Sequence, residues 1–203
     1  MKTSPILASA AFAFALSGTA AFAQTAQTGQ PEVKRIGDFV VRCFPVKSVA
    51  PCDMYQERAN KETGQRVLTF SLAYMPSGNR YILQVSVPLG VSIEKGVVIT
   101  GGSYTSPALP FRRCDQAGCY VEAAVNKDLL DNFAKLGSDV KIRVVPDGGG
   151  KAFDFPFSFD GFSAAHDDMV ASNKAKAATA EELQAAQAAA QAQQQAAQPA
   201  PAK

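Results

Sequence analysis

Four cysteines carry the most reactive side chains of this 203-residue chain, at Cys43, Cys52, Cys114 and Cys119. An even number of cysteines favours disulfides when a chain works in an oxidising compartment, and four cysteines allow three connectivities. We predict Cys43–Cys52 and Cys114–Cys119, because the partners are near in sequence and each pair can close across a turn. Zinc is the alternative, but eight and four intervening residues fit zinc-ligand spacing poorly. The prediction is two local disulfides and no metal site.

The chain has a single histidine, His166, on which any Ser-His-Asp or Cys-His arrangement would depend. It precedes Asp167 and Asp168 at the expected margin of the folded region, where few neighbours are available to hold a catalytic histidine in place. We interpret it as a surface histidine beside two carboxylates. The sequence has no Gly-x-Ser-x-Gly elbow, phosphate-binding glycine loop or dinucleotide fingerprint. We therefore expect no catalytic residue and no cofactor.

Carboxylates are the other candidates for catalysis, since two of them at a suitable separation can act as proton donor and acceptor. Most lie in expected turns or on outward faces of expected strands, where a solvated charge is the ordinary state. Their spacing singles out no pair, so a carboxylate-dependent hydrolase is only the third of three functional hypotheses. The residues considered are Glu57, Glu62, Glu94, Asp115, Glu122, Asp154 and Asp160.

The most distinctive segment is residues 111–120, which contains two cysteines and a short turn between them. A disulfide here would give a rigid hairpin that displays Arg112, Arg113 and Tyr120. Rigid loops bearing Arg and Tyr are effective contact surfaces, because little conformational entropy is lost on binding. We take these three residues as the candidate interaction site. The alternative is a purely structural hairpin with ordinary surface charges.

The first residues have the form of a secretory leader. Lys2 supplies a positive charge, residues 6–16 are apolar, and residues 21–23 read Ala-Phe-Ala, a typical cleavage site. Cleavage after Ala23 is favoured over a retained anchor, because the apolar stretch is short for a bilayer span. No cysteine follows the site, which argues against a lipoprotein. We assign 1–23 to a signal peptide and expect a periplasmic, secreted or outer-surface protein with no transmembrane segment after cleavage.

Alternation of apolar and polar side chains dominates the middle of the chain. It is clearest in residues 68–74, 81–87, 140–144 and 153–159, and it places one face of each segment in a core. Further strands are expected at 36–43, 53–59, 96–100, 109–114 and 119–125. The turn-forming segments 76–79 and 146–150 each join two strands as a hairpin.

Two residues refine this strand pattern. Pro156 cannot donate a ladder hydrogen bond, so its strand should lie at a sheet edge or carry a bulge. Asn126 is typical of a helix N-cap, and residues 129–136 have helical apolar spacing that ends at Gly137. Many short strands, hairpins and one short helix predict an all-β fold, an antiparallel β-sandwich, with a small barrel as the alternative.

Composition changes at both ends of this region. Residues 24–35 are polar and are expected to be a flexible lead-in. From residue 175 to the end, 21 of 29 residues are Ala or Gln, and Leu183 is the one large apolar side chain. Residues 179–182 have the form of a capping box, so a solvated helix or a disordered segment is expected there. We assign 36–168 to the sandwich domain and 169–203 to an Ala/Gln-rich low-complexity tail.

Six segments between residues 36 and 165 carry distinctive motifs. They are Gly37-Asp38-Phe39-Val40-Val41-Arg42-Cys43, Cys52-Asp53-Met54-Tyr55-Gln56, Lys61-Glu62-Thr63-Gly64-Gln65, Val87-Pro88-Leu89-Gly90-Val91, residues 109–119 and Ser158-Phe159-Asp160-Gly161-Phe162. Together, and in the same order, they resemble the invasion-associated locus B family, whose Gly-Asp-Trp opening has Phe39 in place of Trp here. The resemblance implies an exported protein of α-proteobacteria with an immunoglobulin-like sandwich and two local disulfides, and it supplies no catalytic residues. The tail lies outside the shared region.

These observations favour an exported, non-enzymatic binding protein of the bacterial envelope, linked to host-cell adhesion or invasion. Its partner would be an unknown protein or envelope component. A formal net charge of +2 provides no basic face for nucleic acid, so no nucleic-acid partner is expected. The alternative is a periplasmic envelope-maintenance or chaperone-like factor, followed by the hydrolase considered above.

Overall fold

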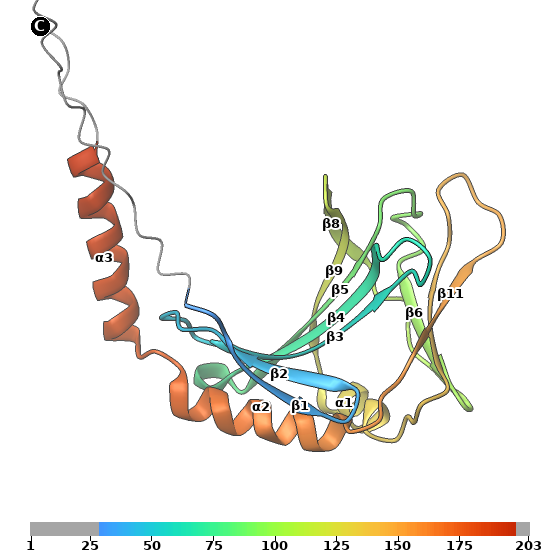
Figure 1. Ribbon diagram of the computed structural model, residues 1–203, viewed down its shortest axis with the longest axis horizontal. Helices are drawn as coiled ribbons and strands as arrows, with labels where there is room; N and C mark the ends of the chain where they lie inside the picture. Colours follow the sequence, from blue (N-terminus) through green and yellow to red (C-terminus); the bar gives the residue numbers. More distant parts are fainter. Residues whose placement is uncertain (1–28, 198–203) are drawn as a thin grey trace, which may run out of the picture.

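The computed structural model describes residues 29–197, so the expected signal peptide lies outside the described residues. Two antiparallel sheets face each other across one apolar core, and helices close one end of the space between them (Figure 1). This arrangement confirms the predicted antiparallel β-sandwich.

The larger sheet has seven strands in the order β1-β2-β3-β4-β5-β9-β8. Consecutive strands from β1 to β5 are neighbours, which is the meander that the predicted hairpins require. The strands are β1 (Glu32–Ile36), β2 (Phe39–Cys43), β3 (Cys52–Ala59), β4 (Arg66–Met75), β5 (Arg80–Val87), β8 (Phe111–Asp115) and β9 (Gly118–Val125).

The smaller sheet has four strands in the order β11-β10-β6-β7, and these are β6 (Val97–Gly101), β7 (Tyr104–Thr105), β10 (Val140–Val144) and β11 (Phe153–Phe157). Strand β11 holds Pro156 and lies at the edge of this sheet. The prediction from Pro156 is therefore confirmed, since an edge strand leaves half of its backbone groups outside the ladder.

The two-residue alternation has the expected physical effect. In β10, Val140, Ile142 and Val144 are buried while Lys141 and Arg143 are exposed. The buried faces of both sheets meet in a cluster rich in aromatic rings, and full burial of one such side chain stabilises the fold by about 1.5–3 kcal/mol. The phenylalanines of this cluster are Phe39, Phe70, Phe111, Phe133, Phe157, Phe159 and Phe162.

The predicted turns and the first helix also form. Strands β4 and β5 are joined by a single 3₁₀ turn, η1 (Pro76–Gly78), and Asn79 follows it in the left-handed conformation. Helix α1 (Lys127–Phe133) begins after Asn126, whose side-chain oxygen accepts a hydrogen bond from the Leu129 N–H at 2.9 Å. The helix ends before Gly137, earlier than the apolar spacing suggested.

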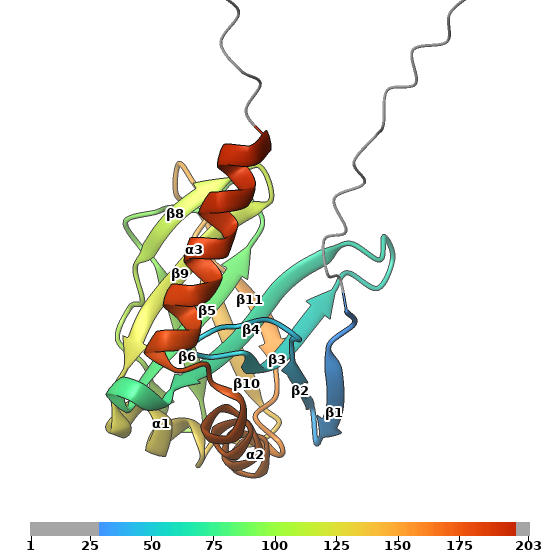
Figure 2. The same cartoon turned by 90° about the vertical axis from the view of Figure 1, so that its left-hand side faces the viewer.

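A second helix was not expected. Helix α2 (Phe162–Lys176) packs along β2 and β3, and it buries Phe162, Ala165, Met169 and Asn173 along one side (Figures 1 and 2). The Asn173 side chain accepts from the Cys52 N–H and donates to the Cys52 C=O, at 2.9 and 2.8 Å. The packed region therefore extends past residue 168, where composition placed the domain boundary. Two of the four buried residues are Ala165 and Asn173. Neither is a large apolar residue, so the sequence showed no continuous apolar face for this helix.

The Ala/Gln-rich segment forms helix α3 (Ala180–Ala197), which stands away from both sheets in Figure 1. Its start has the predicted capping box: the Thr179 N–H donates to Glu182 Oε2, and the Glu182 N–H donates to Thr179 Oγ1. This start is held against the loop between Cys43 and Cys52. The Ala178 N–H donates to the Ser48 carbonyl at 2.9 Å, and Lys47 Nζ pairs with Glu182 at 2.6 Å.

Two glycines allow a close backbone approach between β1–β2 and α2. Gly37 lies in the β1–β2 turn and Gly161 precedes α2, with φ of 59° and 83°. A Cβ on Gly161 would lie 2.8 Å from the Gly37 Cα, closer than real Cβ atoms come. The Asp38 N–H donates to the Asp160 carbonyl at 3.0 Å in the same contact. The start of the sandwich and the start of α2 are thus joined backbone to backbone.

This contact predicts an unequal effect of two chemically identical substitutions. Gly161→Ala and Gly149→Ala both place an alanine at positive φ, but a Cβ at Gly149 would meet nothing within 4 Å. We expect Gly161→Ala to lower the free energy of unfolding by about 1–3 kcal/mol more than Gly149→Ala, because of the added overlap. Urea denaturation of both variants measures the difference. Equal losses would contradict the contact, and failure of the Gly161 variant alone to fold would support it.

Candidate binding sites

Both predicted disulfides are present. Cys43 bonds Cys52 across β2 and β3, and Cys114 bonds Cys119 across β8 and β9. The four sulfur atoms are bonded in pairs, so they are not the free thiolates that a zinc site needs. On the chain-entropy model each short closed loop contributes roughly 2–3 kcal/mol.

The β8–β9 hairpin has little freedom in the structure. Its second strand begins at Gly118, with φ of 145°, and a Cβ there would lie 2.4 Å from the Val87 carbonyl oxygen. The hairpin is therefore pressed directly against the end of β5 and is also closed by the Cys114–Cys119 bond. A covalent bond and a tight backbone contact fix the same few residues.

Two of the three predicted interaction residues lie together on this hairpin. The Arg113 guanidinium is 4.0 Å from the centre of the Tyr120 ring and pairs with Asp115 and Glu122. About half of the Arg113 side chain remains exposed (48%), so the group is ordered and still accessible. Arg112 lies at the register irregularity of β8, is exposed, and has no side-chain hydrogen bond or ion pair within residues 29–197.

A second charged cluster lies on the same sheet and was missed by sequence reasoning. Arg42 on β2 makes two hydrogen bonds to the Asp53 carboxylate on β3 and lies 3.5 Å from the centre of the Tyr55 ring. Ser71 on β4 donates to the same carboxylate at 2.8 Å. The available signal was alternation, which places these side chains on the outward face, but alternation does not reveal which ones pair.

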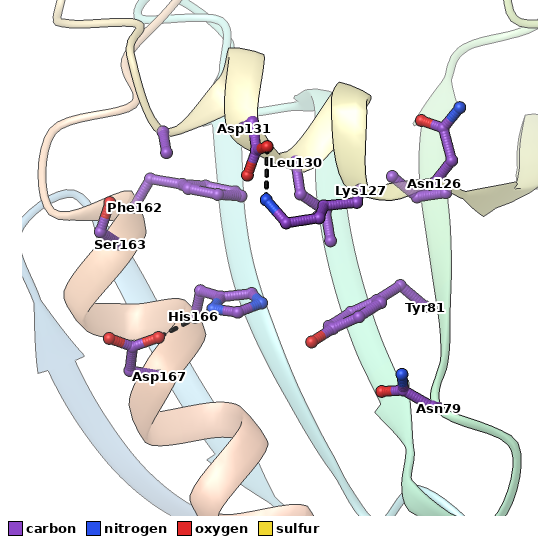
Figure 3. A pocket seen from close by; sticks show the side chains of 12 residues that line it. Asn79, Tyr81, Asn126, Lys127, Leu130, Asp131, Phe162, Ser163, His166 and Asp167 are labelled. Carbon is purple, nitrogen blue, oxygen red and sulfur yellow. Dashed lines mark hydrogen bonds and ion pairs between the residues drawn. The ribbon is translucent and has the colours of Figure 1, made fainter.

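A cavity lies elsewhere, between α1, α2 and the start of β5 (Figure 3). We refer to it as the α1–α2 cavity. Its volume is about 480 Å³, and its lining includes Asn79, Tyr81, Asn126, Phe162, Ser163 and His166. Sequence patterns did not indicate this cavity, because four of its twelve lining residues lie on the unexpected helix α2.

The structure corrects the interpretation of His166 as an ordinary surface residue. Its side chain is only 21% exposed and stacks on Tyr81 and Phe162, with ring centres 5.3 and 6.1 Å away. Nδ1 lies 3.0 Å from an Asp167 oxygen, while Nε2 is buried and has no hydrogen-bond partner among the described residues. The physical reason is that α2 continues the packed region where a tail was expected.

Helix α2 carries the three residue types of a Ser-His-Asp arrangement, at Ser163, His166 and Asp167. A serine nucleophile needs a hydrogen bond from its hydroxyl to the histidine base. Within residues 29–197 the structure shows the His166–Asp167 contact and no hydrogen bond between Ser163 and His166. The nucleophile–base pair is thus not assembled.

Fold and sites together define a small, doubly disulfide-bonded β-sandwich protein with a helix-closed end. The family model described as "Invasion associated locus B (IalB) protein" matches residues 40–170. The chain belongs to this family. None of the helices in the described part has both the length and the apolar character needed to cross a membrane.

Individual relatives agree with this assignment. Two proteins named "Invasion protein B homolog", from Brucella abortus strain 2308 and from biovar 1 strain 9-941, are each 31% identical over 167 residues. Each match covers 81% of this chain and 95% of the relative. The crystal structure of invasion-associated protein B from Bartonella henselae has a TM-score of 0.59 at 20% identity, over 70% of this chain and 99% of that one. That similarity supports the fold.

The charged groups of the hairpin predict an acid-induced change. The Ala117 backbone N–H, hydrogen-bonded to Asp115 at 2.8 Å, and the Arg113 guanidinium hold the pKa of Asp115 below its usual value. The ordered contacts should therefore persist above the unfolded pKa of about 3.9 and disappear as pH falls through the lower folded value. NMR of the Tyr120 ring against pH measures the midpoint. A midpoint at or above about 3.9, or an unchanged curve in Asp115→Asn, would contradict this.

Proposed function

We propose that this protein is an exported, non-enzymatic interaction protein of the bacterial envelope, which binds a protein or envelope component and contributes to host-cell adhesion or invasion. The observation that carries the proposal is the β8–β9 hairpin with its ordered Arg113 and Tyr120. The names of the Brucella and Bartonella relatives support the link to invasion. The leader-like N-terminus and the two disulfides support export to the periplasm or cell surface.

Preorganisation is the physical reason for choosing the hairpin. Holding a long side chain in one conformation costs about 0.5–1.5 kcal/mol on binding. In the unbound protein the Arg113 side chain is already held by contacts with Asp115, Glu122 and Tyr120, so less of this cost remains on binding. Arg and Tyr are also the residue types that most often carry binding energy at interfaces. Arg112 adds an exposed guanidinium beside them.

Two of the carboxylates considered for hydrolysis are held by arginine. Asp154 accepts from Arg143, and Asp115 accepts from the Ala117 N–H and from Arg113. A carboxylate paired with Arg has a lowered proton affinity, which disfavours the general acid of a hydrolase. The direction is shown at Asp154, where hydrogen bonding to Arg143 lowers the pKa.

The hairpin proposal predicts a local loss of binding. We expect the triple variant Arg112→Ala, Arg113→Ala and Tyr120→Ala to reduce affinity for an envelope partner at least tenfold, about 1.4 kcal/mol. The matched control is Arg143→Ala, which removes an equally exposed, Asp-paired arginine from the other sheet. Partners are identified by cross-linking the full chain in envelope fractions, followed by mass spectrometry and titration of the purified partner.

Three outcomes separate the hypotheses. One or a few defined partners, lost only in the triple variant, support the proposal. Many unfolded clients captured equally by both variants favour the chaperone-like alternative. Hydrolysis of any member of a broad ester, peptide and glycoside panel, abolished by a single carboxylate substitution, would show an enzyme.

Export predicts both processing and thiol state. We expect cell fractionation to find the chain outside the cytoplasm, beginning at Gln24. Non-reduced peptide mapping should yield Cys43 linked to Cys52 and Cys114 linked to Cys119, because the compartment is oxidising. A cytosolic chain that retains its leader and titrates with four free thiols would contradict this location.

A further inference from the structure

The α1–α2 cavity is separate from the hairpin and from the charged cluster on β2 and β3. Its volume of about 480 Å³ falls within the range of about 300–1,000 Å³ that is usual for small-molecule sites. Its walls come from four elements: the start of β5 supplies Tyr81, α1 supplies Lys127 and α2 supplies His166 (Figure 3), and the end of β9 supplies Val125. A side chain from each wall points toward the same space.

Ring faces form one side of this space. Tyr81 and Phe162 both stack on His166, with interplanar angles of 25° and 22°. Each of the two rings thus lies within about 25° of the His166 plane, and Figure 3 shows Phe162 and Tyr81 on two sides of His166. Tyr81 is itself backed by Tyr74, with ring centres 4.8 Å apart. Phe162 is 3% exposed, so the platform that a ligand can touch consists mainly of the partly exposed rings of Tyr81 and His166.

Polar groups that are not fully used surround the rings. His166 Nε2 has no hydrogen-bond partner among the described residues, but it is buried, so the accessible polar groups are those of the residues around it. Asn79 and Asn126 use their side-chain oxygens to accept from the Tyr74 hydroxyl and the Leu129 N–H, which leaves each amide N–H₂ as a donor. The Ser163 hydroxyl can both donate and accept. Donors and acceptors are thus mixed around one platform.

Charge at the cavity is balanced by internal pairs. Lys127 lies 2.6 Å from Asp131, and Asp167 contacts His166. Phosphate recognition usually needs an uncompensated Arg or Lys, and recognition of an ammonium group usually needs an aromatic cage without a second cation beside it. Here the one lysine is paired with Asp131 and already lines the cavity beside the rings. A neutral ligand fits this balance better than either ion.

We propose that the α1–α2 cavity binds a neutral, hydroxyl-rich ring compound, that is, a saccharide of one or two residues. A sugar ring has an apolar C–H face that can lie against the exposed parts of Tyr81 and His166, and hydroxyls at its edge that both donate and accept. This site goes beyond the hairpin proposal, because it uses none of the hairpin residues and its failure leaves that proposal untouched.

The single histidine makes the site directly observable. We titrate the full chain with maltose and with N,N′-diacetylchitobiose, and follow the His166 Cε1 proton by NMR. We expect at least one of the two to give a saturable shift at millimolar concentration. Choline chloride and sodium phosphate are titrated in parallel, and neither should give a saturable shift.

Two variants with matched controls test the geometry. Tyr81→Ala removes part of the platform and should weaken binding at least tenfold, whereas Tyr104→Ala removes a half-buried tyrosine that does not line this cavity. Ser163→Phe should fill the cavity and abolish binding, whereas Ala164→Phe adds the same ring at the neighbouring exposed position of α2. Ser163 is exposed, so its variant keeps the core intact even if Tyr81→Ala does not fold.

The outcomes are decisive in both directions. Saturable binding of a saccharide that is lost in Ser163→Phe and kept in Ala164→Phe supports the site. A saturable response to choline or phosphate with none to either saccharide overturns the proposed ligand class. No response to any probe up to 50-fold above the protein concentration and into the tens of millimolar, or binding that survives Ser163→Phe, overturns the site itself.

Discussion

Backbone contact at Gly37 and Gly161 brings two distant parts of the chain within the distance of a hydrogen bond. It also places Phe39 among the rings of Phe157, Phe159 and Phe162, with centre-to-centre distances of 5.8–6.3 Å. The seven-stranded sheet, the last strand of the four-stranded sheet and the start of α2 therefore meet at one residue. Without small residues at both glycine positions, α2 would have to begin farther from the sheet.

The position of α2 in turn determines which surfaces exist. Its first turns carry Phe162 and His166 to the start of β5, and the α1–α2 cavity lies where these elements face each other. The β8–β9 hairpin depends on none of these contacts, since its order comes from the Cys114–Cys119 bond and from Gly118. The stability of the two proposed sites is thus set by different interactions.

The sequence predicted those features that depend on a few neighbouring residues. Alternating side chains predicted the strands, Asn126 predicted the start of α1, Pro156 predicted an edge strand, and cysteines near in sequence predicted the disulfide pairs. It was uninformative about α2, because Ala165 and Asn173 are buried through contacts made by the partner strands rather than through their own apolar character. The cavity was missed for the same reason. The hairpin was predicted from its cysteines. The ion pair between Arg113 and Glu122 was not, because it joins two strands and depends on how β8 and β9 are aligned.

The loop closed by Cys43 and Cys52 holds the start of α3 through Ser48 and Lys47. Mechanical force applied along α3 would therefore reach the sandwich at a covalently closed ring, before it reaches the buried face of α2. Tension would be shared between the Ala178–Ser48 hydrogen bond, the Lys47–Glu182 pair and the first turn after α2. Because the ring cannot open without breaking a covalent bond, the strands β2 and β3 beneath it would resist being peeled apart from that corner.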